Sequence, residues 1–140
     1  MALTPTPIAR LANRPGGQKW TASPPCCNAA TGRLDERLWR GRFEGRALGT
    51  GVSVIFFASE RPGAGPVLHV HPYDEVFIVR AGRALFTLGS ETVTAEAGQI
   101  LLCPAHVPHK FANLGPGLLE TTDIHLSDRL IQTDLPDPQA

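Results

Sequence analysis

Frequent glycines and prolines divide this sequence into runs that are too short for ordinary helices. The 140 residues include 14 glycines and 13 prolines, and alternating apolar and polar residues lie between them. No run shows a long 3.6-residue periodicity, whereas about eight show the two-residue period of a strand. The expected strands cover residues 48–59, 66–71, 75–80, 83–89, 91–96, 99–104, 109–114 and 118–127. This pattern predicts an all-β sandwich or barrel.

Three histidines and one glutamate are placed on these predicted strands at a spacing that suits a metal ion. His69 and His71 are two residues apart in the run VLHVH, so both side chains point to one face of a strand. A short turn leads to Glu75 at the start of the next run, and His109 opens a later one. Imidazole and carboxylate groups are usual ligands of divalent first-row metals. The spacing therefore predicts a metal site to which His109 is brought by the fold.

The chain resembles the cupins at both of their sequence motifs. The first motif, G-x5-H-x-H-x3-E-x6-G, is matched at every position by Gly63, His69, His71, Glu75 and Gly82. The second motif, G-x5-P-x-G-x2-H-x3-N, is matched by Gly98, Pro104, His109 and Asn113. One position departs, because His106 stands where the family has glycine. We expect His106 to be a solvent-facing turn residue with positive φ, which histidine tolerates better than most residues.

The resemblance covers roughly residues 43–131 and implies a double-stranded β-helix, or jelly-roll barrel, around one metal ion. Carried over position by position, the implied ligands are His69, His71, Glu75 and His109. The cofactor expected first is Fe, with Mn, Ni, Zn, Cu or Co as alternatives. Small family members usually pair their barrels, which implies a homodimer.

Glu75 has two candidate roles. As a ligand it fixes charge on the metal, and released from the metal it becomes a general base and so a catalytic residue. We expect the pocket around the metal to be mostly apolar, with an interior lined by Val67, Phe77, Phe86, Leu102 and Phe111.

Asp123 and His125 share one face of the last predicted strand, so both line the pocket or both face solvent. The pocket is favoured, because Ile124 and Leu126 can cover the outer face of a sandwich.

Charge and composition divide the chain into an extension, a barrel and a tail. Residues 1–42 hold seven basic residues against two acidic ones, and we expect a flexible, mostly irregular, proline-rich extension that contacts the barrel through Trp20 or Trp39. Residues 43–131 form the predicted barrel and residues 132–140 a polar C-terminal tail. Residues 43–140 carry a net charge of −5, which argues against a nucleic-acid ligand.

The sequence also lacks the features of a membrane or secreted protein. No stretch approaches 18 consecutive apolar residues, and the N-terminus has no apolar signal core. The three cysteines form no C-x-x-C pair, and an odd number without a disulfide framework suits a reducing cytoplasm. We therefore expect a cytoplasmic protein whose partner is a small molecule.

Three functions fit a metal with open coordination positions. The first is an Fe(II)-type dioxygenase acting on an aromatic or enolisable substrate, which the apolar pocket favours. The second is a non-redox isomerase, lyase or decarboxylase acting on a sugar or small acid, which needs further acid–base groups such as Asp123 and His125. The third is a binding or sensing protein without turnover.

Overall fold

The computed structural model describes residues 39–138, and its regular structure is almost entirely β. The strands are β1 (Gly41–Phe43), β2 (Ser53–Ser59), β3 (His69–Val70), β4 (Glu75–Ala81), β5 (Arg83–Leu88), β6 (Glu91–Glu96), β7 (Ile100–Cys103), β8 (His109–Asn113), β9 (Leu119–His125) and β10 (Thr133–Asp134). One short 3₁₀ helix, η2 (Gly45–Leu48), follows β1. Within residues 39–138, no helix has the length and hydropathy that crossing a bilayer requires.

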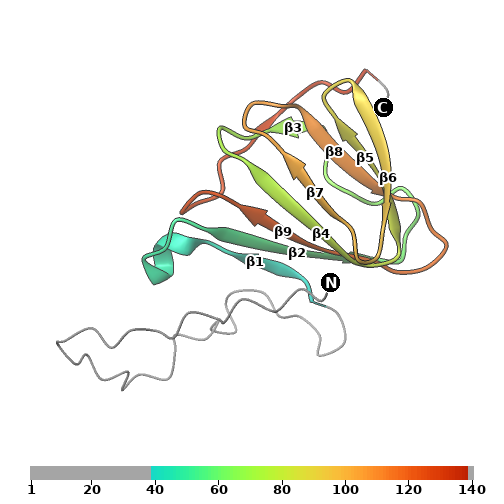
Figure 1. The fold of residues 1–140 in the computed structure, drawn as a ribbon, viewed down its shortest axis with the longest axis horizontal. Helices are drawn as coiled ribbons and strands as arrows, with labels where there is room; N and C mark the ends of the chain where they lie inside the picture. The colour runs from blue at the N-terminus through green and yellow to red at the C-terminus, as the bar shows by residue number, and fades with distance from the viewer. Residues whose placement is uncertain (1–38, 139–140) are drawn as a thin grey trace, which may run out of the picture.

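The strands form two antiparallel sheets that face each other (Figure 1). The first sheet has the order β1-β2-β9-β4-β7, and the second has the order β10-β3-β8-β5-β6. The chain passes repeatedly from one sheet to the other, so strands that are distant in sequence become neighbours. This arrangement is the predicted jelly-roll barrel, and the all-β expectation is confirmed.

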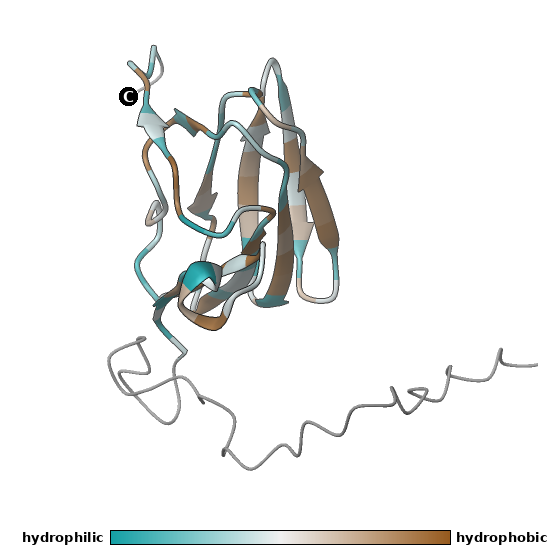
Figure 2. Cartoon of the chain, turned by 90° about the vertical axis from the view of Figure 1, so that its left-hand side faces the viewer, coloured by the Kyte–Doolittle hydropathy of each residue, from teal (hydrophilic) through white to brown (hydrophobic). Residues whose placement is uncertain are grey.

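Two-residue alternation decides what each strand presents to the barrel interior. On β4, Glu75, Phe77 and Val79 are buried while the residues between them are only partly so. Strand β8 buries alternate residues in the same way, and β9 does so along its whole length. In Figure 2 the apolar positions gather on the long strands and the polar ones on the connecting segments. The core consists of Phe77, Val79, Ala84, Phe86, Ala95, Cys103, Phe111 and Leu119.

Two of the five predicted interior residues are not in the interior. Val67 is 59% exposed and precedes β3, which is shorter than the predicted strand, while Leu102 is 55% exposed. On β7 the inward residues are Leu101 and Cys103, so the predicted strand is real but its inward phase is shifted by one residue. A shift of one residue exchanges the two faces of a strand.

The chain on either side of the predicted strands also contributes to the sheets. Strand β1 pairs with β2, and β10 pairs with β3, although residues 41–42 were assigned to the extension and residues 132–140 to a tail. Trp39 packs edge-on against Phe56 with ring centroids 5.3 Å apart, and Arg80 lies over its indole ring. The rest of the predicted extension, including Trp20, lies outside the described residues.

Two turn positions need an unusual backbone. Gly82 connects β4 to β5 with φ of +73°, and a Cβ atom there would lie 2.2 Å from the Leu118 carbonyl oxygen. His106, in the β7–β8 turn, has φ of 65° and is exposed to solvent. The expectation of a solvent-facing, left-handed residue at His106 is confirmed.

Candidate metal centre and its pocket

Three strands bring the four predicted ligands to one end of the barrel interior. His69 in β3 pairs directly with His109 in β8, and Glu75 is the first residue of β4. His71 follows β3 by one residue. All four side chains are buried, and their ligand atoms lie within 4.8 Å of one another. The group can therefore hold one metal ion.

Backbone carbonyls fix the orientation of the three imidazole rings. The Nδ1 atoms of His69 and His109 lie 2.6 Å and 2.8 Å from the carbonyl oxygens of Val67 and Val107, each two residues earlier in the chain. The Nδ1 atom of His71 lies 2.6 Å from the carbonyl oxygen of Ile131, which comes from the C-terminal segment. An Nδ1–H donated to a carbonyl leaves Nε2 free as a metal ligand, and this is the usual outer contact of metal-binding histidines.

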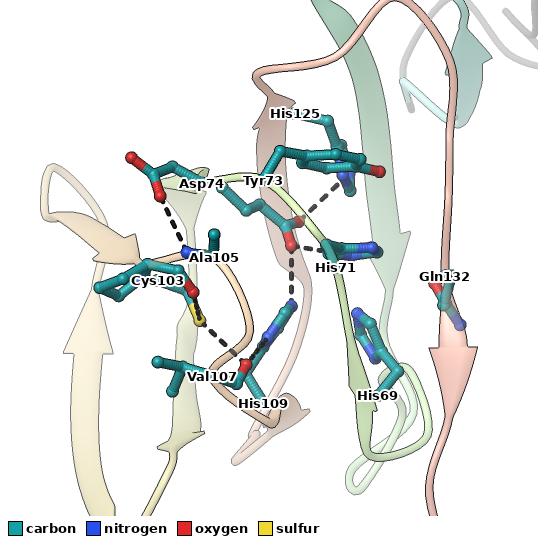
Figure 3. A network of polar contacts seen from close by, with 12 residues as sticks. His69, His71, Tyr73, Asp74, Cys103, Ala105, Val107, His109, His125 and Gln132 are labelled. Atoms are coloured by element: carbon teal, nitrogen blue, oxygen red, sulfur yellow. Dashed lines mark hydrogen bonds and ion pairs between the residues drawn. The ribbon is translucent and has the colours of Figure 1, made fainter.

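The Glu75 carboxylate lies among three imidazoles, and Figure 3 shows His71, His109 and His125 directed toward one another. Its Oε2 atom is 2.8 Å from His109 Nε2 and 3.2 Å from His71 Nε2. Its Oε1 atom is 3.2 Å from Nε2 of His125, at the end of β9. The two oxygens thus face different partners, with Oε2 on the side of the predicted ligands.

The charges in this cluster balance without a metal. Burial raises the pKa of Glu75, but the contacts with His109 and His71 outweigh burial and lower this pKa to about 2. Burial lowers the pKa of His109, while contacts with Cys103 and Glu75 raise it to about 10. Burial lowers the pKa of His125 to about 4. The metal-free cluster is therefore an ion pair between anionic Glu75 and cationic His109.

These residues fit a divalent transition metal. The donor set is three imidazole nitrogens and one carboxylate oxygen, which are ligands that such metals accept. The buried Nε2 atom of His71 lies 3.2 Å from Glu75 Oε2 but makes no well-aligned hydrogen bond among residues 39–138, as expected for an atom that is free to coordinate. Metal binding would displace the proton of His109, because a ligand must be deprotonated.

Two adjoining cavities open beside this cluster. An inner chamber of about 210 Å³ is lined by Ile55, Phe57, Gly65, Pro66, His69, Glu75, Phe77, Phe111, Asp123, His125 and Gln132. An outer chamber of about 430 Å³ shares Ile55, His125 and Gln132 with it and adds Arg42, His71, Leu130 and Asp134. The inner chamber combines aromatic walls with the carboxyl groups of Glu75 and Asp123, and the outer one adds Arg42 and Asp134. Each of the predicted pocket residues, Phe77, Phe111, Asp123 and His125, lines the inner chamber.

Several residues around the metal ligands and the two chambers gave no signal in the sequence. Tyr73 stacks on His71 with ring centroids 5.0 Å apart, and its hydroxyl accepts a hydrogen bond from the backbone N–H of Ile131. Gln132 lines both chambers from a segment that looked like a polar tail. Phe57 is different, because side-chain alternation along β2 places it on the face opposite Phe56. That alternation could have identified Phe57 as a pocket residue from the sequence.

Comparison with known sequences assigns the family. The profile of the cupin domain matches residues 56–125, which is half of the chain. The chain belongs to the cupin family. This cupin is also 42% identical over 48 residues to an uncharacterized protein of Streptomyces coelicolor, and the match covers 34% of this chain and 46% of that relative.

Solved structures show the same fold in larger proteins. The S161A variant of Bacillus subtilis oxalate decarboxylase superposes on this cupin with a TM-score of 0.62 and 22% identity, covering 68% of this chain and 27% of the decarboxylase. A structure of the same enzyme studied for its Mn(II) centres gives a TM-score of 0.65 and 20% identity, covering 76% and 30% of the two chains. At this identity the likeness establishes the fold. The cupin spans less than half the length of each of these relatives.

Proposed function

We propose that this cupin is a mononuclear metal enzyme that acts on a small molecule, and that its reaction is an Fe(II)-type dioxygenation of an aromatic or enolisable substrate. The observation that carries the proposal is the convergence of three oriented imidazoles and one carboxylate on a chamber with aromatic walls. Three or four protein ligands leave coordination positions open for substrate and dioxygen.

The chain supplies binding and orientation in this proposal. His69, His71, Glu75 and His109 would hold the metal, which supplies Lewis-acid or redox chemistry when it is bound. Phe77 and Phe111 would pack against the apolar part of the substrate and keep water away from it. Glu75 would take or return a proton at its Oε1 atom, on the side of His125.

A second candidate is a non-redox reaction, such as decarboxylation of a small acid, isomerisation or lyase chemistry. Two observations favour it. Asp123 and His125 place ionisable groups inside the chamber, and the structures of similar fold include a decarboxylase with Mn(II) centres. A binding or sensing protein without turnover is the third candidate.

Metal content and oxygen consumption separate these candidates. The full chain should be purified without a polyhistidine tag, analysed for metals, and loaded in turn with Fe(II), Mn(II) and Zn(II). The dioxygenase proposal expects stoichiometric Fe and substrate-dependent O2 uptake with catechols or 1,3-diketones. Turnover of small acids by the Mn(II) form without O2 uptake would replace it by the second candidate, and tight binding without turnover by the third.

We further propose that the protein is a cytoplasmic homodimer that pairs through the outer face of the β1-β2-β9-β4-β7 sheet. The pairing registers place an apolar row across this whole face, formed by Phe43, Val54, Ile124, Val76 and Leu102. Ile100 and Leu102 on its edge are 66% and 55% exposed, so a second copy would bury them. Sedimentation of a 15.0 kDa monomer at micromolar concentration would contradict this pairing.

A further inference from the structure

Strand β9 presents an unusual row of polar side chains to the barrel interior. Thr121, Asp123 and His125 alternate along its inner face, and all three are at most 4% exposed. Asp123 Oδ1 and His125 Nδ1 have no hydrogen-bond partner among the described residues. The Thr121 side chain contacts Asp123, and His125 Nε2 lies 3.2 Å from Glu75 Oε1. Most buried polar atoms in proteins are hydrogen-bonded, so each exception requires an explanation.

The position of the row relative to the metal ligands is fixed by strand pairing. His125 pairs with Glu75 across β4 and β9, and Asp123 pairs with Phe77. Alternate residues of a strand are roughly 6–7 Å apart, so Asp123 lies one such step deeper in the barrel than His125. The row therefore leads from the metal ligands into the inner chamber.

Apart from the metal ligands His69 and Glu75 and from Gln132, the other walls of the inner chamber are apolar. Phe57, Phe77 and Phe111 line it, and the rings of Phe57 and Phe111 meet edge-on with centroids 5.1 Å apart. Asp123 and His125 also line it, and each carries an unpartnered atom. The chamber thus combines hydrogen-bonding groups from one strand with aromatic surfaces from others.

We propose that Asp123 and His125 bind the oxygen-bearing edge of a small, planar ligand whose ring or enol plane rests against the phenylalanines. The ligand class is a single-ring phenol, a catechol or an enolised diketone. The chamber of about 210 Å³ is smaller than the usual pocket for a drug-sized molecule, which selects for a single ring. The choice of this class rests on the proposed function, but the binding itself requires no turnover.

Unpaired buried groups also predict a trade-off between binding and stability. An unpaired polar atom in the interior destabilises a fold, and replacing it by an apolar group of similar size removes that penalty. If Asp123 serves a ligand, its replacement by leucine should stabilise the free protein and weaken ligand binding. A carboxylate with a purely structural role would give the opposite change in stability.

The test compares two probes of the same shape. Catechol has adjacent hydroxyl groups, and 1,2-difluorobenzene has the same ring without oxygen. Their affinities are measured by calorimetry for the full chain, both metal-free and loaded with redox-inert Zn(II). We expect Asp123→Leu to weaken catechol binding at least tenfold in both forms, to leave 1,2-difluorobenzene within a factor of two, and to raise the melting temperature.

Three further variants keep the result interpretable. Asp123→Asn retains a hydrogen-bonding group and should keep catechol affinity within about threefold. Thr122→Val changes the outward face of the same strand and should leave catechol affinity unchanged. His125→Leu should also weaken catechol binding. Because this variant also removes a contact to the metal ligand Glu75, the decisive variant is Asp123→Leu.

The outcomes separate this inference from the enzyme proposal. Failure of the unaltered protein to bind catechol, or equal catechol affinity in Asp123→Leu, would overturn the inference whether or not the protein is an enzyme. A lower melting temperature in Asp123→Leu with unchanged affinity would assign Asp123 a structural role instead. Catechol binding that depends on Asp123, with no O2 uptake or product in the Fe(II) form, would leave the inference standing and contradict the dioxygenase.

Discussion

Strands β4 and β9 lie side by side and bury their inner faces equally, yet they present opposite chemistry. From the metal end inward, β4 shows Glu75, Phe77 and Val79, whereas the paired residues of β9 are His125, Asp123 and Thr121. The polar residue of β4 is surrounded by partners, because Glu75 contacts three histidines. On β9, Asp123 Oδ1 and His125 Nδ1 have no hydrogen-bond partner among the described residues.

The difference shows that burial alone does not distinguish a structural residue from a functional one. Phe77 and Val79 belong to the apolar core, and their burial stabilises the fold. Asp123 is buried to the same extent, but burial raises its pKa to about 8, which reflects the unfavourable environment of its charge. Substitutions on β4 or on β9 therefore test the two sides of this comparison separately.

The largest expected effect is on the metal ligands. His71→Ala should abolish stoichiometric metal binding, because it removes an oriented Nε2 donor from a four-residue set. Circular dichroism should stay β-like. Elemental analysis after dialysis measures the change, with His106→Ala as the control that keeps its metal. Stoichiometric metal in the His71→Ala protein would remove His71 from the ligand set.

The second-largest effect is expected on folding stability, when an apolar side chain of β4 is shortened. Phe77→Ala removes a core side chain that is 2% exposed and packs against Phe86 and Phe111. We expect the free energy of unfolding to fall by about 3–5 kcal/mol, measured by urea denaturation. Val93→Ala, at a 41% exposed position on β6 in the other sheet, is the control that should change stability by less than about 1 kcal/mol. Similar losses in both variants would contradict the assignment of the core.

Glu75→Gln removes the charge that distinguishes β4 at the metal end. The fold should persist, because glutamine has the same shape, but Zn(II) or Mn(II) affinity should fall by at least about tenfold, equivalent to about 1.4 kcal/mol. Competition with a chromogenic chelator measures the affinity. Unchanged affinity together with unchanged activity would exclude both roles assigned to Glu75.

The effect that is smallest per pH unit is the pH dependence contributed by β9, because it is spread over several pH units. The folded-state pKa of Asp123, about 8, exceeds its ordinary value of 3.8, so the folded state holds this proton more tightly than the unfolded chain. Its contribution to stability is complete below about pH 3.8 and is lost as the pH rises to about 8. Metal-free native protein should therefore lose up to about 1 kcal/mol per pH unit relative to Asp123→Asn in this window. Parallel stability curves for the two proteins would contradict the raised pKa.

The inward face of a strand could be predicted from the sequence where one residue of expected orientation set the alternation. Glu75 and His109 fixed the inward phase of β4 and β8, so Phe77 and Phe111 followed correctly. In the run ILLC every residue is apolar, so nothing in the sequence distinguished Leu101 from Leu102 as the inward residue.

Other parts of the site depend on tertiary contacts that no local pattern encodes. Strand β10 has only two residues, and its pairing with β3 could not be recognised from the sequence. The position of Gln132 in both chambers follows from that pairing. Tyr73 looked like a turn residue, and its stacking on His71 appears only when the turn is folded.

The carbonyl of Ile131 that orients His71 gives the end of the chain a direct influence on the metal. The segment carrying it is held only at a few points, including the β10 pairing and the ion pair of Lys110 with Asp137. A proteolytic cut or a bound partner that lifts this segment would free the His71 ring to rotate while the barrel stays intact. Metal occupancy would then report whether the C-terminal segment and its strand β10 are docked, before any other strand is lost.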